Sequence, residues 1–205
     1  RLEADGSITI VTPKLSSGHI PDGNTQIAVS PDGLWYCITS NFKDSVQVWC
    51  TDKTGKASLL PIAFNRSSFG DAYKVRDARI DVGDDGRIAI IVTAVGSKGQ
   101  GPYHERVYRA AADGTNLTEI ASFTEDRIGG IVDIAIGPDN NVYVKICKGP
   151  TGKGGSSIYQ ITSEGTITEM INFAPGRDPA CMDVDSTGNV WFNTTVGVFR
   201  IVRNG

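Results

Sequence analysis

The feature that most constrains the fold is a pattern that occurs four times along the chain. Each copy has an alternating apolar run, a tight polar turn and a second apolar run. The four copies are QIAVSPDGLWYC (26–37), RIDVGDDGRIAI (79–90), DIAIGPDNNVYV (133–144) and CMDVDSTGNVWF (181–192). Alternation with a period of two on both sides of a D-G, D-N or T-G turn is typical of a β-hairpin. The aligned turn residues are of types that accept a positive φ angle, namely Gly33, Gly86, Asn140 and Gly188.

Two further strands are predicted after each hairpin. Third apolar runs cover 46–55, 106–114, 158–165 and 198–205, and they share one aromatic column, Trp49, Tyr108, Tyr159 and Phe199. Fourth runs follow three of them, at 56–64, 115–123 and 166–173. The last unit stops at Gly205 before its fourth strand, and the N-terminal run SITIVTPKL (7–15) has the pattern expected of that strand.

The spacing of the turns predicts the architecture. The turn residues lie 53, 54 and 48 positions apart, and the spacing continued through the C-terminus to the first turn would be 50. A four-stranded unit repeated around an axis is a β-propeller blade, and a ring closed by an N-terminal strand leaves no long sheet edge unpaired. We therefore predict an all-β single domain over 1–205 with almost no helix, a four-bladed propeller whose N-terminal strand completes the last blade. The blades would cover 16–64, 65–123, 124–173, and 174–205 together with 1–15; an arc of a six- or seven-bladed propeller is the alternative.

The turn motif of these units is similar to that of known propeller families. The segments IAVSPDGLWY, IAIGPDNNVYV and MDVDSTGNVWF resemble the blade motif of the NHL, gluconolactonase-like and streptogramin B lyase-like propellers. The resemblance covers all four units and concerns packing and turn residues, so it implies the fold. The metal-binding and catalytic residues of those families lie on motifs that have no match here, so the resemblance implies no activity.

Composition excludes several partner classes. The 205 residues carry 20 basic and 23 acidic side chains, a net charge of −3, which lacks the basic excess of a nucleic-acid binder. No apolar run approaches the roughly 18 residues that a membrane-spanning helix needs. The chain begins with Arg1 and has no charged-then-apolar leader, so we expect a processed chain or a domain cut from a longer protein.

The predicted connections differ at the two ends of the blades. Connections after the first and third strands are short and mostly closed by glycine, whereas the others are long and varied. Binding residues commonly lie on irregular loops held by a rigid scaffold, so we predict the ligand site on the long-loop face. Its candidate binding residues are His19, Arg66, Phe69, Tyr73, Tyr103, His104 and Arg177.

Exposed aromatic rings beside arginines suit sugar rings, anionic groups or a protein partner. We therefore predict a non-enzymatic recognition module that binds a carbohydrate or a protein, as a domain of an attachment, adhesion or virion fibre protein at an extracellular or virion surface. His19 with Asp22, and His104 with Glu105, pair a base with a carboxylate, but no hydrolase motif accompanies them. The alternatives are a metal-dependent hydrolase or lyase of the gluconolactonase or streptogramin-lyase type, and a structural spacer.

One pair of carboxylates suggests a metal. Asp81 and Asp183 stand five residues before the turn in blades 2 and 4, where the other blades have alanine. In a four-fold ring they would face each other across the axis and repel unless a cation, a proton or an arginine intervened. Ca²⁺ in the central channel is therefore a candidate cofactor, with Asp81 and Asp183 as ligands. Two alternatives remain open: Arg79 and Asp133 neutralise each other or these carboxylates, or a rotated strand lets the carboxylates bond backbone amides between blades.

The four cysteines form two candidate pairs. We expect Cys37 and Cys50, which flank the loop 41–45, to lie opposite each other on neighbouring strands, and Cys147 and Cys181 to lie toward the long-loop face. Either pair could form a disulfide in an oxidising compartment. Cross-strand disulfides are geometrically awkward, however, and a core of this size needs no covalent links, so we predict four free thiols.

Overall fold

The computed structural model describes residues 26–40, 45–70, 72–96, 103–125, 133–148 and 154–202. Within these ranges the chain forms fifteen β-strands in four antiparallel sheets and one turn of 3-10 helix, η1 (Arg66–Ser68). Strands that are consecutive in sequence are neighbours in every sheet. The all-β prediction is therefore confirmed, and so is the division of the described chain into four hairpin-based units.

Each sheet contains one predicted unit. Sheet 1 contains β1 (Gln26–Val29), β2 (Trp35–Ser40), β3 (Ser45–Thr51) and β4 (Ala57–Asn65). Sheet 2 contains β5 (Tyr73–Val82), β6 (Ile88–Gly96), β7 (Tyr103–Ala110) and β8 (Thr118–Glu125). Sheet 3 contains β9 (Asp133–Ile136), β10 (Val142–Cys147), β11 (Ser156–Ile161) and β12 (Ile167–Phe173). Sheet 4 contains β13 (Met182–Val184), β14 (Val190–Thr194) and β15 (Gly197–Ile201).

The first turn of each unit has the predicted backbone. Gly33, Gly86 and Gly188 have φ angles of 82°, 79° and 83°, and Asn140 has a φ of 61°. In every turn the amide of this residue donates a hydrogen bond to the carbonyl three residues earlier, as from Gly33 to Ser30 at 2.8 Å. Because a side chain other than that of glycine or asparagine is strained in this region, the turn chemistry determines where each hairpin reverses.

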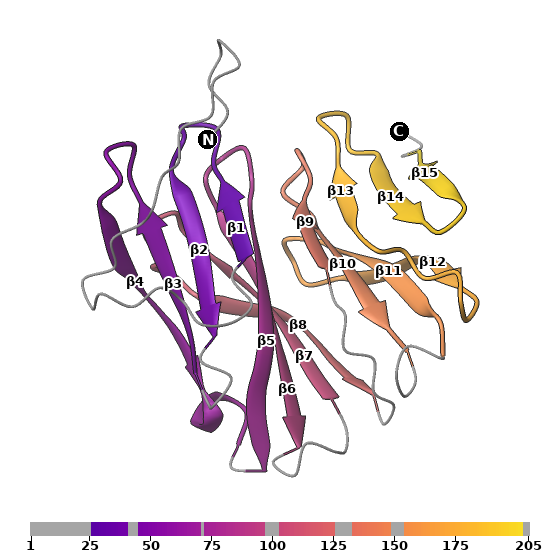
Figure 1. Cartoon of the computed structure of the whole chain (residues 1–205), viewed down its shortest axis with the longest axis horizontal. Coiled ribbons are helices and arrows are strands. Elements are labelled where there is room, and N and C mark those ends of the chain that lie inside the picture. The colour runs from indigo at the N-terminus through magenta and orange to yellow at the C-terminus, as the bar shows by residue number, and fades with distance from the viewer. Residues whose placement is uncertain are drawn as a thin grey trace.

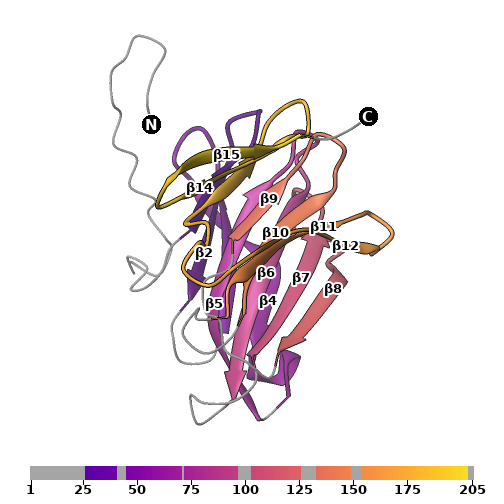
Figure 2. The ribbon, with the colours of Figure 1, turned by 90° about the vertical axis from the view of Figure 1, so that its right-hand side faces the viewer.

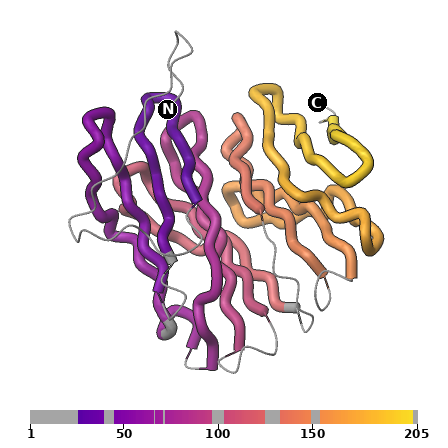
Figure 3. The backbone as a smooth tube through the Cα atoms, in the orientation of Figure 1, coloured from indigo at the N-terminus to yellow at the C-terminus, as the bar shows by residue number. Residues whose placement is uncertain are grey.

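The four sheets stand side by side in sequence order (Figure 1). Their inner strands are in contact in series, β1 with β5, β5 with β9 and β9 with β13, while the other strands lie progressively farther out. Figure 2 shows the same sheets from the side, and Figure 3 follows the backbone through them as four successive meanders. Among the described residues, no comparable contact joins β13 back to β1. The predicted N-terminal closing strand, residues 7–15, lies outside the described residues.

Apolar side chains fill the seams between neighbouring sheets. The cluster between sheets 1 and 2 includes Phe64, Ile90 and Tyr108, all of them buried. The cluster between sheets 2 and 3 includes Val107 and Ile146, which are buried as well. A third cluster, between sheets 3 and 4, contains the buried residues Phe173, Met182 and Phe192. The core is therefore divided among the seams, and each sheet depends on its neighbours for burial.

None of the four cysteines forms a disulfide within the described residues, in agreement with the prediction of thiols. The expectation that Cys37 and Cys50 face each other is wrong, because Cys37 is opposite Trp49 and Cys50 is opposite Tyr36. A register that differs by one residue places a side chain on the other face of the sheet. Cys37 and Cys50 therefore lie on opposite faces of sheet 1. In the described part of the chain, no helix has the length and apolar character needed to span a membrane.

Candidate functional site

The predicted binding residues separate into three groups. His19 lies outside the described residues, and Arg66 begins η1 without a described side chain. Four of the others, Phe69, Tyr73, Tyr103 and His104, lie at the long-loop end of sheet 2. Arg177 lies apart from them, in the connection between sheets 3 and 4. The structure therefore does not bring the set together in one place, and their binding roles remain predictions.

Tyr73 and His104 meet across the end of β6. Tyr73 is opposite Gly96 on β6, and His104 is opposite Ala94 on the other side of the same strand. Because those two β6 residues are small, the tyrosine ring can lean over the strand, and its Oη lies 2.8 Å from Nε2 of His104. Burial, and secondarily the charge of Arg106, lowers the pKa of His104. The imidazole is therefore held as a neutral hydrogen-bonding partner at neutral pH.

The expectation that Phe69 and Tyr103 are exposed is wrong. Phe69 packs into the core between sheets 1 and 2, with the guanidinium carbon of Arg106 4.9 Å from the centre of its ring. Tyr103 is buried on β7, and its hydroxyl accepts a hydrogen bond from Nη1 of Arg76. Tyr103 is buried because β7 begins earlier than predicted and includes it, whereas Phe69 lies in the turn after η1 and packs inward from there. This end of sheet 2 is a packed network of rings and cations.

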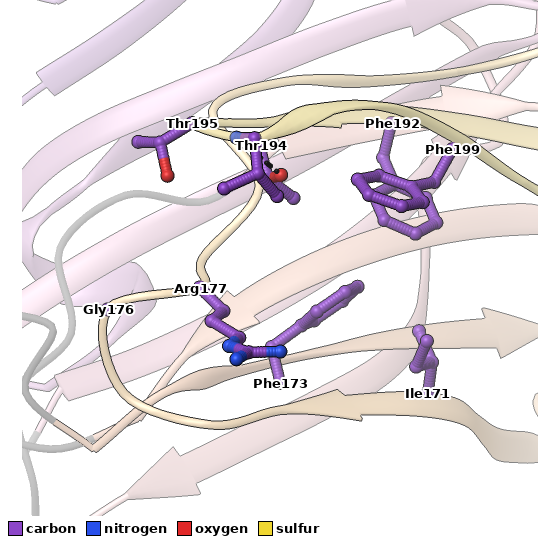
Figure 4. A pocket seen from close by; sticks show the side chains of 9 residues that line it. Ile171, Phe173, Gly176, Arg177, Phe192, Thr194, Thr195 and Phe199 are labelled. Atoms are coloured by element: carbon purple, nitrogen blue, oxygen red, sulfur yellow. Dashed lines mark hydrogen bonds between the residues drawn. The ribbon is translucent and has the colours of Figure 1, made fainter.

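A cavity of about 450 Å³ opens at the long-loop end of the seam between sheets 3 and 4 (Figure 4). Its walls come from the end of β12, the connection that follows it, and the hairpin of β14 and β15. The lining residues are Ile171, Phe173, Gly176, Arg177, Phe192, Thr194, Thr195, Val196 and Phe199. Figure 4 shows Ile171, Phe173 and Arg177 on one side, and Thr194, Phe192 and Phe199 on the other. This is the candidate functional site.

In the seams between sheets 1 and 2 and between sheets 2 and 3, a pair of aromatic rings occupies the position that corresponds to this cavity. The aromatic residue of the third strand packs against a phenylalanine near the end of the fourth strand of the preceding sheet. Tyr108 meets Phe64 with ring centroids 4.6 Å apart, and Tyr159 meets Phe123 at 5.1 Å. The direct ring pair closes each of these seams.

The third seam departs from this pattern. By repeat position, Phe199 and Phe173 would form the ring pair. Instead, Phe173 meets Phe192 edge-on at 5.1 Å, and Phe199 stacks on Phe192 at 5.7 Å with the ring planes 19° apart. Phe173 and Phe199 both line the cavity, and Phe199 is 43% exposed. The cavity thus occupies the place of a missing aromatic contact.

The polar groups of the cavity come from its two connecting segments. Arg177 is exposed, and among the described residues its guanidinium has no hydrogen-bond or ion-pair partner. Its segment is held in place because Nζ of the buried Lys145 donates a hydrogen bond of 2.6 Å to the carbonyl of Pro179. Thr194 Oγ1 accepts a hydrogen bond from the amide of Val196 at 3.2 Å, which leaves its hydroxyl proton free to donate. The cavity therefore combines apolar ring faces, one cation and the hydroxyl groups of Thr194 and Thr195.

The sequence prediction included Arg177 but missed the rings around it. The sequence pattern places Phe199 in the aromatic column, Phe173 at the end of the fourth run 166–173 and Phe192 at the end of the hairpin 181–192, as in the other units. Nothing in the sequence indicates that the ring pair is absent in the last seam.

The carboxylates proposed as calcium ligands are placed differently from each other. Oδ2 of Asp81 accepts a hydrogen bond of 2.7 Å from the amide of Ile136 on the next sheet. Burial raises the pKa of Asp81, and the charges of Asp183 and Asp133 act in the same direction. Asp183 is exposed, and its Oδ1 accepts from the amide of Val184 at 2.8 Å. Asp81 thus follows the alternative in which a carboxylate bonds a backbone amide between neighbouring sheets.

No cluster of three or more histidine, cysteine, aspartate or glutamate side chains suited to a metal ion occurs in the ranges that the structure describes. Asp133 instead repeats the inter-sheet contact, because its Oδ2 accepts from the amide of Met182 at 2.8 Å. The calcium site of Asp81 and Asp183 stays a prediction, and the observed contacts give Asp81 a structural role.

Comparison with known proteins indicates the fold. No family model matches the chain, and no curated protein matches it. A solved protein from Lactobacillus plantarum has a TM-score of 0.56 and 16% identity, covering 100% of this chain and 60% of that one. Streptogramin B lyase has a TM-score of 0.50 and 19% identity, covering 91% of this chain and 56% of the lyase. The Nup133 β-propeller domain of Vanderwaltozyma polyspora has a TM-score of 0.47 and 9% identity, covering 85% and 54%.

The likeness to these solved structures agrees with the predicted resemblance to β-propellers, and at under 25% identity it concerns the fold alone. The chain spans little more than half the length of the structures named above. A shared fold at this level of identity does not indicate an activity.

Proposed function

We propose that the chain is a non-enzymatic binding module that takes a carbohydrate in the cavity between sheets 3 and 4. The observation that carries this proposal is the missing ring contact, which leaves Phe173 and Phe199 on the walls of a cavity of about 450 Å³. That volume is within the range of roughly 300–1,000 Å³ that is usual for small-ligand sites. A module of this kind would suit an attachment or adhesion protein at an extracellular or virion surface.

The lining fits the two kinds of surface that a sugar presents. One face of a pyranose ring carries C–H groups that pack on a flat aromatic ring, and Phe199 offers such a face because it is 43% exposed. The rim of the sugar carries hydroxyls, which need polar partners once water is excluded. Thr194 and Arg177 supply a hydroxyl and a guanidinium at the edge of the cavity.

The proposal is tested by screening the purified chain on a glycan array and titrating the best ligand by calorimetry. The Phe199→Ala variant should bind at least tenfold more weakly, because it removes the exposed stacking face. Val198→Ala is the matched control, since Val198 is the neighbouring residue on β15, is 69% exposed and does not line the cavity. A blank array, or equal loss of binding in both variants, would contradict the proposal.

We also propose that the chain is a single propeller domain over 1–205 with four blades, closed by residues 7–15 pairing with β15. Support comes from the spacing of the four turns and from sheet 4, whose three described strands leave β15 at an edge where the other sheets have a fourth strand. An unpaired edge strand exposes a row of backbone donors and acceptors.

Hydrogen exchange tests this closure. In the full chain, the amides of Gly197–Ile201 that point away from β14 should be protected, and deletion of residues 1–15 should make them exchange rapidly. The amides of β6 serve as the internal control, because that strand is paired on both sides. Equal exchange at β15 in the two proteins would exclude the pairing.

A further inference from the structure

We infer that the carbohydrate carries an anionic group, a carboxylate or a sulfate, and that Arg177 pairs with it. This inference rests on the proposed function and specifies the ligand class of the same cavity. Three observations support it: Arg177 has no partner among the described residues, no acidic residue lines the cavity, and backbone contacts hold the segment that carries Arg177.

Arg177 is the exception among the arginines whose side chains are described. Each of six others has a hydrogen-bond, ion-pair or ring partner within the described chain; they are Arg76, Arg79, Arg87, Arg106, Arg109 and Arg200. Arg177 has none of these, and its side chain points into the cavity beside Phe173 (Figure 4). A guanidinium has five donors in a fixed planar fork, which matches the oxygens of a carboxylate or sulfate.

No protein carboxylate neutralises this charge within the cavity. The lining residues include no aspartate or glutamate. The acidic residue nearest in sequence is Asp178; its Oδ1 is buried and has no hydrogen-bond partner, and among the described residues no ion pair joins it to Arg177. The cavity therefore has a positive charge beside apolar ring faces. Because a charge-assisted hydrogen bond is strengthened where water is partly excluded, an anionic group is favoured there over a neutral hydroxyl.

Backbone contacts hold the segment that carries Arg177 beside the cavity. Arg177 follows Gly176, whose φ of 79° turns the chain, and its amide donates to the carbonyl of Ala174 at 3.1 Å. On the other side, the bond from Lys145 to Pro179 fastens the segment to sheet 3. A pre-positioned cation loses less conformational entropy on binding than one on a free loop.

The test uses oligosaccharides of uronic acids, each paired with its neutral methyl ester, in calorimetric titrations of the full chain. The acid should bind at least tenfold more tightly than its ester, and the difference should shrink with added salt. Arg177→Gln should abolish the difference while keeping the binding of the ester, and Arg200→Gln, outside the cavity, is the matched control. A sulfated sugar against its unsulfated parent forms the second arm and distinguishes the two anionic groups.

The outcomes separate this inference from the proposed function. If neutral sugars bind and neither a carboxylate nor a sulfate increases the affinity, the anionic ligand is excluded and the carbohydrate module stands. If Arg177→Gln leaves the preference for the anion unchanged, the assignment of Arg177 is wrong. If no sugar of any charge binds, the proposed function fails and this inference fails with it.

Discussion

Sheets 2 and 4 are built from the same repeat but differ in how their side chains are covered. All residues of β6 except the last are buried, since sheet 2 lies between sheets 1 and 3. On β15 every residue except the last is exposed. Tyr108 and Phe199 occupy the same position of the repeat, yet Tyr108 is 8% exposed and Phe199 is 43% exposed.

This comparison indicates that the repeat determines the local backbone geometry of each hairpin, whereas the neighbouring sheet determines how far the side chains are buried. The first turns of the two sheets and the strand register beside those turns are alike, so the turn geometry is not the cause of the difference. The seam between sheets 1 and 2 is closed by ring contacts, and we expect it to dominate stability. The seam between sheets 3 and 4 also has one ring contact across it, Phe173 with Phe192, but Phe199 is left 43% exposed, which makes this seam the more tolerant place for a binding cavity.

The largest expected effect compares the two kinds of seam directly. Phe64→Ala removes a 2%-exposed ring that packs on Tyr108, and it should lower the free energy of unfolding by about 3–5 kcal/mol. Phe173→Ala removes the equivalent ring beside an existing cavity, so its loss should be smaller. Urea denaturation of the two variants measures the difference. Equal losses would show that the third seam is as tightly packed as the first.

The next effect concerns the carboxylate that links sheets 2 and 3. Asp81→Ala leaves the amide of Ile136 without its acceptor and should cost about 1–3 kcal/mol of unfolding free energy. Asp81→Asn keeps an acceptor oxygen of the same shape and should cost less than the alanine variant. Thermal denaturation with and without added Ca²⁺ is the control for the calcium hypothesis. A Ca²⁺-dependent rise in melting temperature that Asp81→Asn abolishes would favour the metal site over the purely structural role.

A smaller effect is the pH dependence of the same contact. Burial raises the pKa of Asp81 above its ordinary value of 3.8, so the folded state holds this proton more tightly than the unfolded state. The contribution of Asp81 to stability is therefore greatest at pH values below 3.8, and it decreases as the pH rises from 3.8 to the folded-state pKa. The measurement is the difference in unfolding free energy between wild type and Asp81→Asn from pH 3 upward. A difference that moves in favour of wild type as the pH rises would contradict the raised pKa.

The sequence predicted the elements that depend on local chemistry. The hairpin turns at Gly33, Gly86, Asn140 and Gly188 were predictable because a positive φ angle restricts the residue type, and the strands because alternation has a period of two. Features that depend on contacts between sheets were less accessible. The burial of Phe69 could not be inferred from its loop-like surroundings, since the ring is covered by residues far away in the chain.

The candidate site was only partly predictable for the same reason. Arg177 was found because a long connection carries a charged residue, but the cavity beside it arises from a contact that fails to form in one seam of three. The cysteine error has a more local cause. Cys37 lies six residues before position 43, the centre of the loop 41–45, whereas Cys50 lies seven residues after it. The register therefore pairs Cys37 with Trp49 and places Cys50 on the opposite face.

The smallest expected effect concerns how fast the four cysteine thiols react, and it involves no change in the free energy of unfolding. Cys181 is exposed, Cys37 and Cys147 are buried, and burial raises the pKa of the Cys37 and Cys50 thiols. Because the thiolate is the reactive form, a colorimetric thiol titration of the native chain should show one fast equivalent and three slow ones. Cys181→Ser should remove the fast phase alone, while denaturation without reductant should release all four thiols of the wild type. Fewer than four would show that a disulfide forms, and the one-residue register makes Cys37 with Cys50 the pair least able to supply it.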